Sequence, residues 1–226
     1  MRHFEDELDK LQRRLLEMAG LVESAISGSV RSLAGRDEAQ AQGVLQNEAQ
    51  INQMQIEIDE MATHLLALHQ PKAGDLRFLT AAIKINSDLE RMGDLAVNIV
   101  ERAIDLMRRP LVKPLIDVPK MAELTQSMVH KSLDAFVNRD AALARSVLVS
   151  DDAVDDLKDA IYQELILFME SEPSKVAAAV DLIFVAHNLE RIADHATNIA
   201  EDVLFLIKGV DVRHHAEAPE SSSSHG

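Results

Sequence analysis

Residues 90–101, ERMGDLAVNIVE, are repeated one hundred residues later by residues 190–201, ERIADHATNIAE. Seven of the twelve positions are identical, and five of these identities are polar: two glutamates, an arginine, an aspartate and an asparagine. A repeat kept only for packing would preferentially preserve its apolar positions. The repeated stretch therefore predicts a duplicated chain that carries a surface rich in oxygen ligands on each copy.

The composition favours helices. Aromatic residues make up 3% of the 226 residues, Trp is absent, and Gly and Pro number only 8 and 6. Strands prefer aromatic and β-branched residues, whereas Ala, Leu and Met are strong helix formers. We therefore expect an all-α fold.

Apolar residues recur at helical spacing in six segments that are separated by turn residues. Around the repeat, residues 51–58 match residues 154–161 with an offset of 103, so the two halves correspond helix for helix. The sequence predicts helices over about 4–33, 37–68, 74–108, 119–138, 140–170 and 174–208, the last ending at Gly209 as a C-cap.

This pattern predicts two tandem three-helix bundles related by internal duplication, with six long helices in all. We expect the first bundle in residues 1–108 and the second in residues 119–209. A proline-containing linker, residues 109–118, joins them, and residues 210–226 form a disordered tail.

The chain carries a formal net charge of −15 and no cysteine. A nucleic-acid-binding protein needs a basic face, so this charge argues against nucleic acid as a partner and against docking on anionic lipid. The absence of cysteine excludes disulfides and thiolate metal sites. The sequence contains no run of about 18 apolar residues, which a transmembrane helix would need, so we expect a soluble cytoplasmic protein.

The polar identities share one face of each predicted helix. On a helix that turns about 100° per residue, Glu90, Asp94, Asn98 and Glu101 fall within a strip about 80° wide and ~16 Å long. The apolar residues of the same segment fall on another side, so the strip points away from the core. The second copy gives the same strip with Glu190, Asp194, Asn198 and Glu201.

Carboxylates one turn apart repel each other, by ~1–3 kcal/mol for charges about 5 Å apart, so something must compensate them. A hard cation is one solution, because such ions take carboxylate and amide oxygens as ligands. The other solution is a solvated acidic face neutralised by Arg91 and Arg191. Both copies keep the same four oxygen-bearing residues, which favours metal, and several shared carboxylates favour a multinuclear site.

Further carboxylates lie on segments that could face the strips. Asp151 and Asp155 repeat the four-residue spacing within residues 140–170, and their counterparts in the first half are Glu48 and Asn52. These residues could supply additional oxygen ligands, although many acidic residues of such a helix are simply solvated.

Three other residues are open to two interpretations. His187 falls on the second strip and could be a nitrogen ligand, although Ser87 holds the matching place in the first copy. His195 points away from the strip, which favours a surface or packing role. Arg77 can be a helix-start residue or a contact for a partner protein or an anion, and spacing alone favours the helix-start role.

The two strips, the duplicated six-helix plan and the segment from Gln70-Pro71 to Asp75-Leu76-Arg77 together resemble the PhoU family of phosphate-transport regulatory proteins. The resemblance covers about residues 4–208. Its most specific marks are DLERMGD at 88–94 with Asn98, and NLERIAD at 188–194 with Asn198.

The resemblance implies two three-helix bundles, often in a homodimer, with multinuclear metal clusters at the surface. Iron, zinc, nickel, manganese and magnesium all occur in such clusters across the family. Because Asn52 stands where the second half has Asp155, the two sites need not be symmetric. The implied ligands are Glu90, Asp94, Asn98, Glu101, Glu190, Asp194, Asn198 and Glu201, with Glu48, Asp151 and Asp155 in support.

The activity that the resemblance implies is signalling. A protein of this kind is a negative regulator that couples the phosphate ABC transporter and its ATPase to a sensor histidine kinase. It keeps phosphate-starvation genes off when phosphate is plentiful. It would act in the cytoplasm, at the inner face of the membrane through its partners.

Two alternatives remain at this point. One is an enzyme, a carboxylate-bridged di-metal helical bundle, but such sites use Glu-x-x-His pairs that project into the bundle core, and neither strip contains one. The other is a purely structural bundle in which both strips are solvated surface.

Overall fold

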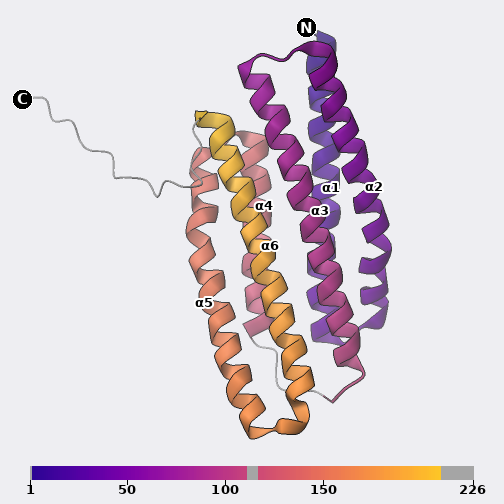
Figure 1. Cartoon of the computed structure of the whole chain (residues 1–226), viewed down its shortest axis with the longest axis vertical. Helices are drawn as coiled ribbons and strands as arrows, with labels where there is room; N and C mark the ends of the chain where they lie inside the picture. The colour runs from indigo at the N-terminus through magenta and orange to yellow at the C-terminus, as the bar shows by residue number, and fades with distance from the viewer. Residues whose placement is uncertain (1, 111–116, 210–226) are drawn as a thin grey trace, which may run out of the picture.

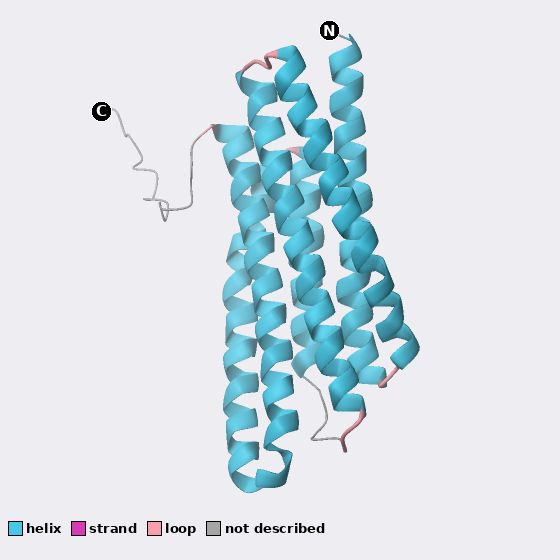
Figure 2. Cartoon of the chain, turned by 45° about the vertical axis from the view of Figure 1, so that its right-hand side comes forward, coloured by secondary structure: helices cyan, strands magenta, loops and turns pink. Residues whose placement is uncertain are grey.

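The fold consists of long antiparallel helices and short turns (Figures 1 and 2). The computed structural model describes residues 2–110 and 117–209, and these contain no strand, which confirms the predicted all-α class. The helices are α1 (Arg2–Gly35), α2 (Glu38–His69), α3 (Ala73–Met107), α4 (Asp117–Asn138), α5 (Ala141–Ser171) and α6 (Val176–Lys208), with a single turn of 3-10 helix, η1 (Pro173–Lys175).

The duplication is visible in matched turns. Asp37 caps α2 by accepting hydrogen bonds from the second and third amide groups that follow it, and Asp140 caps α5 in the same way. The residue before each cap has a left-handed backbone, with φ of 50° at Arg36 and 49° at Arg139. The first two helices of each half therefore meet through the same turn, 103 residues apart.

The two halves lie side by side and share one core (Figure 1). α1, α2 and α3 pack together as one bundle, and α4, α5 and α6 as the other. α3 also packs along α6, and α1 packs against α4, so α3 and α6 are the central helices of the molecule. The pairs Lys84–Asp202 and Arg109–Asp181 show that α3 and α6 run antiparallel.

Two helix ends bear on the predicted boundaries. α4 begins at Asp117, inside the segment 109–118 that we assigned to the linker, because Pro119 is tolerated in the first turn of a helix. α6 ends at Lys208, and Gly209 forms the expected C-cap with φ of 69°. Residues 111–116 of the predicted linker and the predicted tail, 210–226, lie outside the described residues.

Candidate functional site

The two strips lie on the central helices. We call Glu90, Asp94, Asn98 and Glu101 on α3 the first row, and Glu190, Asp194, Asn198 and Glu201 on α6 the second row. The second and third members of each row are exposed, whereas the first member, Glu90 or Glu190, is half-buried. Most of the apolar residues between them are buried, with Val97 only half-buried. Both rows therefore point away from the core, as the helical spacing predicts.

The second row meets α5 at its N-terminal end. Burial, and then the charges of Asp194, Asp155, Asp152 and Glu190, raise the pKa of Asp151 to about 6. Burial also raises the pKa of Asp194, with further contributions from Glu190 and Asp155. Four of the predicted ligands, two from each helix, thus lie near enough for their charges to raise the pKa values of Asp151 and Asp194, although they do not converge on one point.

Lys158 on α5 lies within this carboxylate cluster. Its ammonium donates hydrogen bonds to Asp155 Oδ1 over 3.0 Å and to Glu190 Oε1 over 3.2 Å. These bonds, with that to Asp155 the larger cause, raise the pKa of Lys158 above its ordinary value. Sequence analysis missed this residue. The Asp155–Lys158 spacing was a usable signal, but the partner on α6 depends on how the two helices are aligned.

One oxygen of the cluster has no hydrogen bond. Glu190 Oε2 is buried and lacks a hydrogen-bond partner, although His187 Nδ1 lies 3.3 Å away. A buried carboxylate oxygen without a partner is costly, so this atom is suited to a cation. His187 lies beside the second row, and its role as a nitrogen ligand stays a prediction.

The first row faces α2 with fewer charges. Burial, and then the charge of Asp94, raise the pKa of Glu90, while Arg91 and His195 oppose the shift. On α2, Asn52 Oδ1 is buried and has no hydrogen-bond partner. Glu48, one turn before it, is half-buried. Each half thus has a buried oxygen without a hydrogen bond, at Glu190 of the second row and at Asn52, which is not among the implied ligands.

The later members of the second row face a different neighbour. Asn198 Nδ2 donates a 3.5 Å hydrogen bond to Asp88 Oδ1 on α3. The cleft between α3 and α6 has a volume of about 300 Å³ and is lined by Lys84, Ser87, Asp88, Asn198, Glu201 and Asp202. The second row is therefore divided between α5 and α3, and its four members do not surround a single point.

His195 does not lie free on the surface. Its Nδ1 is 2.8 Å from Asp88 Oδ1, and both side chains are largely buried between α3 and α6. The matching positions of the other copy hold Leu95 and Asn188. Of the two roles that we expected for His195, the structure shows packing, and it adds an interhelical hydrogen bond that sequence analysis missed.

Arg77 lies at the C-terminal end of α6. Its Nε donates a 3.4 Å hydrogen bond to Leu206 O, one of the last carbonyl groups of that helix. Such carbonyl groups lack partners within the helix and carry a partial negative charge, which a guanidinium offsets. The contact gives Arg77 a structural role, and its predicted contact with a partner protein stays a prediction.

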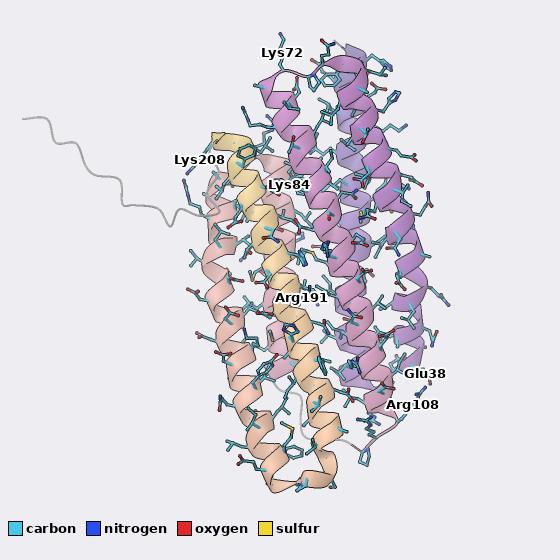
Figure 3. All side chains as sticks on the ribbon, in the orientation of Figure 1. Glu38, Lys72, Lys84, Arg108, Arg191 and Lys208 are labelled. Atoms are coloured by element: carbon cyan, nitrogen blue, oxygen red, sulfur yellow. The ribbon has the colours of Figure 1, made fainter. Side chains whose placement is uncertain are left out.

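The charges along these helices are mixed rather than uniformly acidic. Figure 3 shows Lys84 near the upper part of the α3–α6 seam and Arg191 near the middle of α6. Neither Arg91 nor Arg191 forms a salt bridge with the rows within residues 2–110 and 117–209, and the nearby charge of Arg91 only partly opposes the raised pKa of Glu90.

No group of three or more His, Asp or Glu side chains converges into a ready-made metal site in the described part of the chain. The donor chemistry still fits a hard cation, because carboxylates from two helices cluster around an unpartnered buried oxygen. Binding would require side-chain rotation and the departure of Lys158 from Glu190. Across residues 2–110 and 117–209, no helix has the length and apolar character needed to cross a membrane.

The fold and the site define a duplicated helical-bundle protein with an oxygen-rich row on the central helix of each half. The chain belongs to the PhoU family. The PhoU domain matches it twice, over residues 15–103 and 118–203.

Relatives and solved structures agree with this assignment. A Pseudomonas aeruginosa protein named phosphate-specific transport system accessory protein PhoU homolog is 40% identical over 93% of this chain and 88% of its own. An Aquifex aeolicus protein of the same name is 38% identical over 92% and 94%. The crystal structure of PhoU from Pseudomonas aeruginosa aligns with a TM-score of 0.89 at 38% identity, covering 92% of this chain and all of that one. The phosphate transport system regulatory protein PhoU from Streptococcus pneumoniae aligns with a TM-score of 0.86 at 31% identity, over 92% and 99%.

Proposed function

We propose that this protein is an accessory regulator of phosphate uptake that keeps the phosphate-starvation response off when phosphate is plentiful. The observation that carries the proposal is the double match to the PhoU domain, together with relatives named for phosphate-specific transport over nearly their whole length. Its partners are the ATPase of the phosphate ABC transporter and a sensor histidine kinase. It acts in the cytoplasm, as a homodimer held at the inner face of the membrane by these partners.

The role is that of an adaptor rather than an enzyme. Reactive di-metal helical bundles place their carboxylates in the bundle core, where water and competing reactions are excluded. Both rows here lie on outward faces, and the members after Glu90 and Glu190 are mostly exposed. Such a surface suits an ion that shapes a docking face.

The rows bind metal ions, of which iron, zinc, nickel, manganese and magnesium are the candidates. The carboxylates Asp151, Asp155, Glu190 and Asp194 lie together, and mutual repulsion contributes to the raised pKa of Asp151. A cation would offset this repulsion and link α5 to α6 through shared oxygens. The first row would link α2 to α3 in the same way.

Complementation tests the regulatory role. A bacterial strain that lacks its own PhoU protein is supplied with this chain, and a phosphate-starvation reporter is measured in high phosphate. Wild-type protein should repress the reporter, and Glu90→Gln and Glu190→Gln should each weaken repression. Glu170→Gln, which changes an exposed glutamate near the end of α5, is the matched control.

Pull-down separates the partners from the metal. Tagged full-length protein should retain the transporter ATPase and the sensor kinase, and EDTA should reduce the amount retained. Failure to repress with normal folding would overturn the regulatory role. Normal repression by both row variants, together with partner retention that is indifferent to EDTA, would instead overturn only the role of the metal.

A further inference from the structure

We infer that Lys158 is a tethered competitor of the metal ion at the second row, so that the two halves bind metal with unequal affinity. The inference rests on the proposed metal binding and goes beyond it. It assigns to Lys158 the role of a residue that sets affinity, and it predicts one tight site and one weakened site in a chain built from two copies of the same unit.

The ammonium of Lys158 uses the oxygens that a cation would need. Its Nζ contacts Asp155 Oδ1 on its own helix and Glu190 Oε1 on α6, at 3.0 and 3.2 Å. Lys158 and Glu190 are only 20% and 18% exposed, so the pair is shielded from solvent. An ammonium and a metal ion both satisfy carboxylates through positive charge, and they cannot occupy the same space.

The cluster retains attraction for a further cation. The ammonium contacts only Asp155 and Glu190, whereas Asp151 and Asp194 lie nearby, where burial and the surrounding negative charge raise the pKa values of their own carboxyl groups. Glu190 Oε2 has no hydrogen bond even with Lys158 in place. Lysine offers a compact charge on a flexible stem, so its head can swing toward water while its methylene groups remain packed. Metal binding at the second row thus exchanges one cation for another.

The first half lacks this competitor. With the offset of 103 that relates α2 to α5, the position of Lys158 is held by Gln55 and that of Asp155 by Asn52. Gln55 lies on the same close α2–α3 contact, since Asn86 of α3 donates a 2.9 Å hydrogen bond to Gln55 O. A metal ion at the first row therefore displaces no ammonium.

The exchange also changes the surface. Loading of the second row would replace the lysine contact between α5 and α6 with an ion and turn one positive charge toward solvent. The protein would then bind metal in two steps as the metal concentration rises. The first row binds the ion at low concentration, and the second row binds it only when the ion outcompetes Lys158.

Titration of the full-length chain with manganese(II), followed by calorimetry and by the rise in melting temperature, tests this. Lys158→Gln should tighten the weaker class of sites about tenfold or more, the ratio that ~1.4 kcal/mol produces. Gln55→Lys should weaken the tighter class by a similar factor. Lys120→Gln, which removes an exposed ammonium from α4, should leave both classes unchanged.

The outcomes separate the inference from the proposed function. Unchanged affinities in both Lys158→Gln and Gln55→Lys would overturn the competition while leaving metal binding intact. Absence of manganese binding in wild type and in every variant would overturn both. Addition of Glu190→Gln to Lys158→Gln should abolish the gain in manganese affinity. If the gain in affinity persists, the tightened site lies elsewhere than at the second row. Gln55→Lys alters a half-buried polar residue, so it keeps the test open if Lys158→Gln fails to fold.

Discussion

Lys84 on α3 donates a 2.7 Å hydrogen bond to Asp202 on α6, and the residues at the two matching positions near the opposite end of these helices, Phe184 and Arg102, meet in a different kind of contact. Phe184 lies one hundred residues after Lys84 and Arg102 one hundred residues before Asp202, and the Arg102 guanidinium lies 5.3 Å from the Phe184 ring centroid. At these positions the duplicated halves thus exchange an ion pair for a cation–π contact, while Arg102 forms its ion pair with a different carboxylate of α6, that of Asp181. The seam between the bundles is symmetric in backbone and asymmetric in chemistry.

This asymmetry gives a stability prediction. Lys84→Met should lower the free energy of unfolding by about 2 kcal/mol, because Asp202 is buried and loses a charged partner. Lys84→Met combined with Asp202→Asn should recover part of the loss, since the buried charge is gone as well. Urea denaturation followed by circular dichroism measures both. A double variant no more stable than Lys84→Met would show that the ion pair is not the source of the effect.

A second prediction concerns the contact that brings α2 close to the first row. A Cβ on Gly93 would lie 3.3 Å from two atoms of Ile51, which is tight, whereas the second half pairs the larger Ala193 with the smaller Val154 at the matching positions. In wild type, Gly93→Ala should be neutral or destabilising by up to ~1 kcal/mol, because crowding offsets the gain in helix propensity. In an Ile51→Val background the same change should stabilise by about 0.5–1 kcal/mol.

A double-mutant cycle over these four proteins isolates the coupling between the two sites, with thermal and urea unfolding as readouts. Equal effects of Gly93→Ala in both backgrounds would mean that Ile51 does not restrict this position. Gly74→Ala is a suitable control, because it lies in the first turn of α3 and a Cβ there meets nothing within 4 Å.

The capping aspartates provide a third prediction. Asp140→Ala should destabilise the protein by about 1 kcal/mol, because two amide groups at the start of α5 lose their acceptor. Asp37→Ala should have an effect of similar size, since Asp37 caps α2 with nearly the same distances. Asp140→Asn should retain most of the stability, since asparagine is an equally good cap. A large difference between the two alanine variants would contradict the equivalence of the turns.

The sequence alone was sufficient for the helices and for the direction of the rows. Apolar spacing predicts each helix to within a few residues, because burial of one face decides where a helix lies. The same periodicity predicts that Asp94 and Asp194 point outward, since they are about half a turn away from the buried residues. The extent of a helix and the direction of its polar face are both determined by the residues of that helix alone.

What could not be predicted depends on two helices at once. Lys158 meets Glu190, and His195 meets Asp88, through contacts between residues 32 and 107 positions apart. A single sequence defines the faces of each helix but not how far one helix slides along another. The division of the second row, with Asn198 facing α3 and Glu190 facing α5, follows from that alignment. Duplication made the two rows look equivalent, whereas their neighbours make them different.

The last prediction concerns the pH dependence of the second row. The carboxyl group of Asp151 has a pKa of about 6 in the folded protein and 3.8 when free of these neighbours, so folding favours its protonated form. Its stabilising contribution is therefore fully present below pH 3.8 and is lost as the pH rises through about 6. In EDTA, Asp151→Asn should be more stable than wild type at pH 7.5, because it removes a repelled charge, and the difference should become smaller as the pH falls through about 6 and approach zero only near pH 3.8. With manganese(II) at pH 7.5, the stability advantage of Asp151→Asn over wild type should become smaller or change sign, since the amide is a poorer ligand than the carboxylate. Urea unfolding at each pH measures the difference, and Asp156→Asn, an exposed residue of the same helix that does not contribute to the raised pKa of Asp151, serves as the control. A stability difference between Asp151→Asn and wild type that is constant from pH 5 to 7.5 would contradict the raised pKa and, with it, the crowding of carboxylates between α5 and α6.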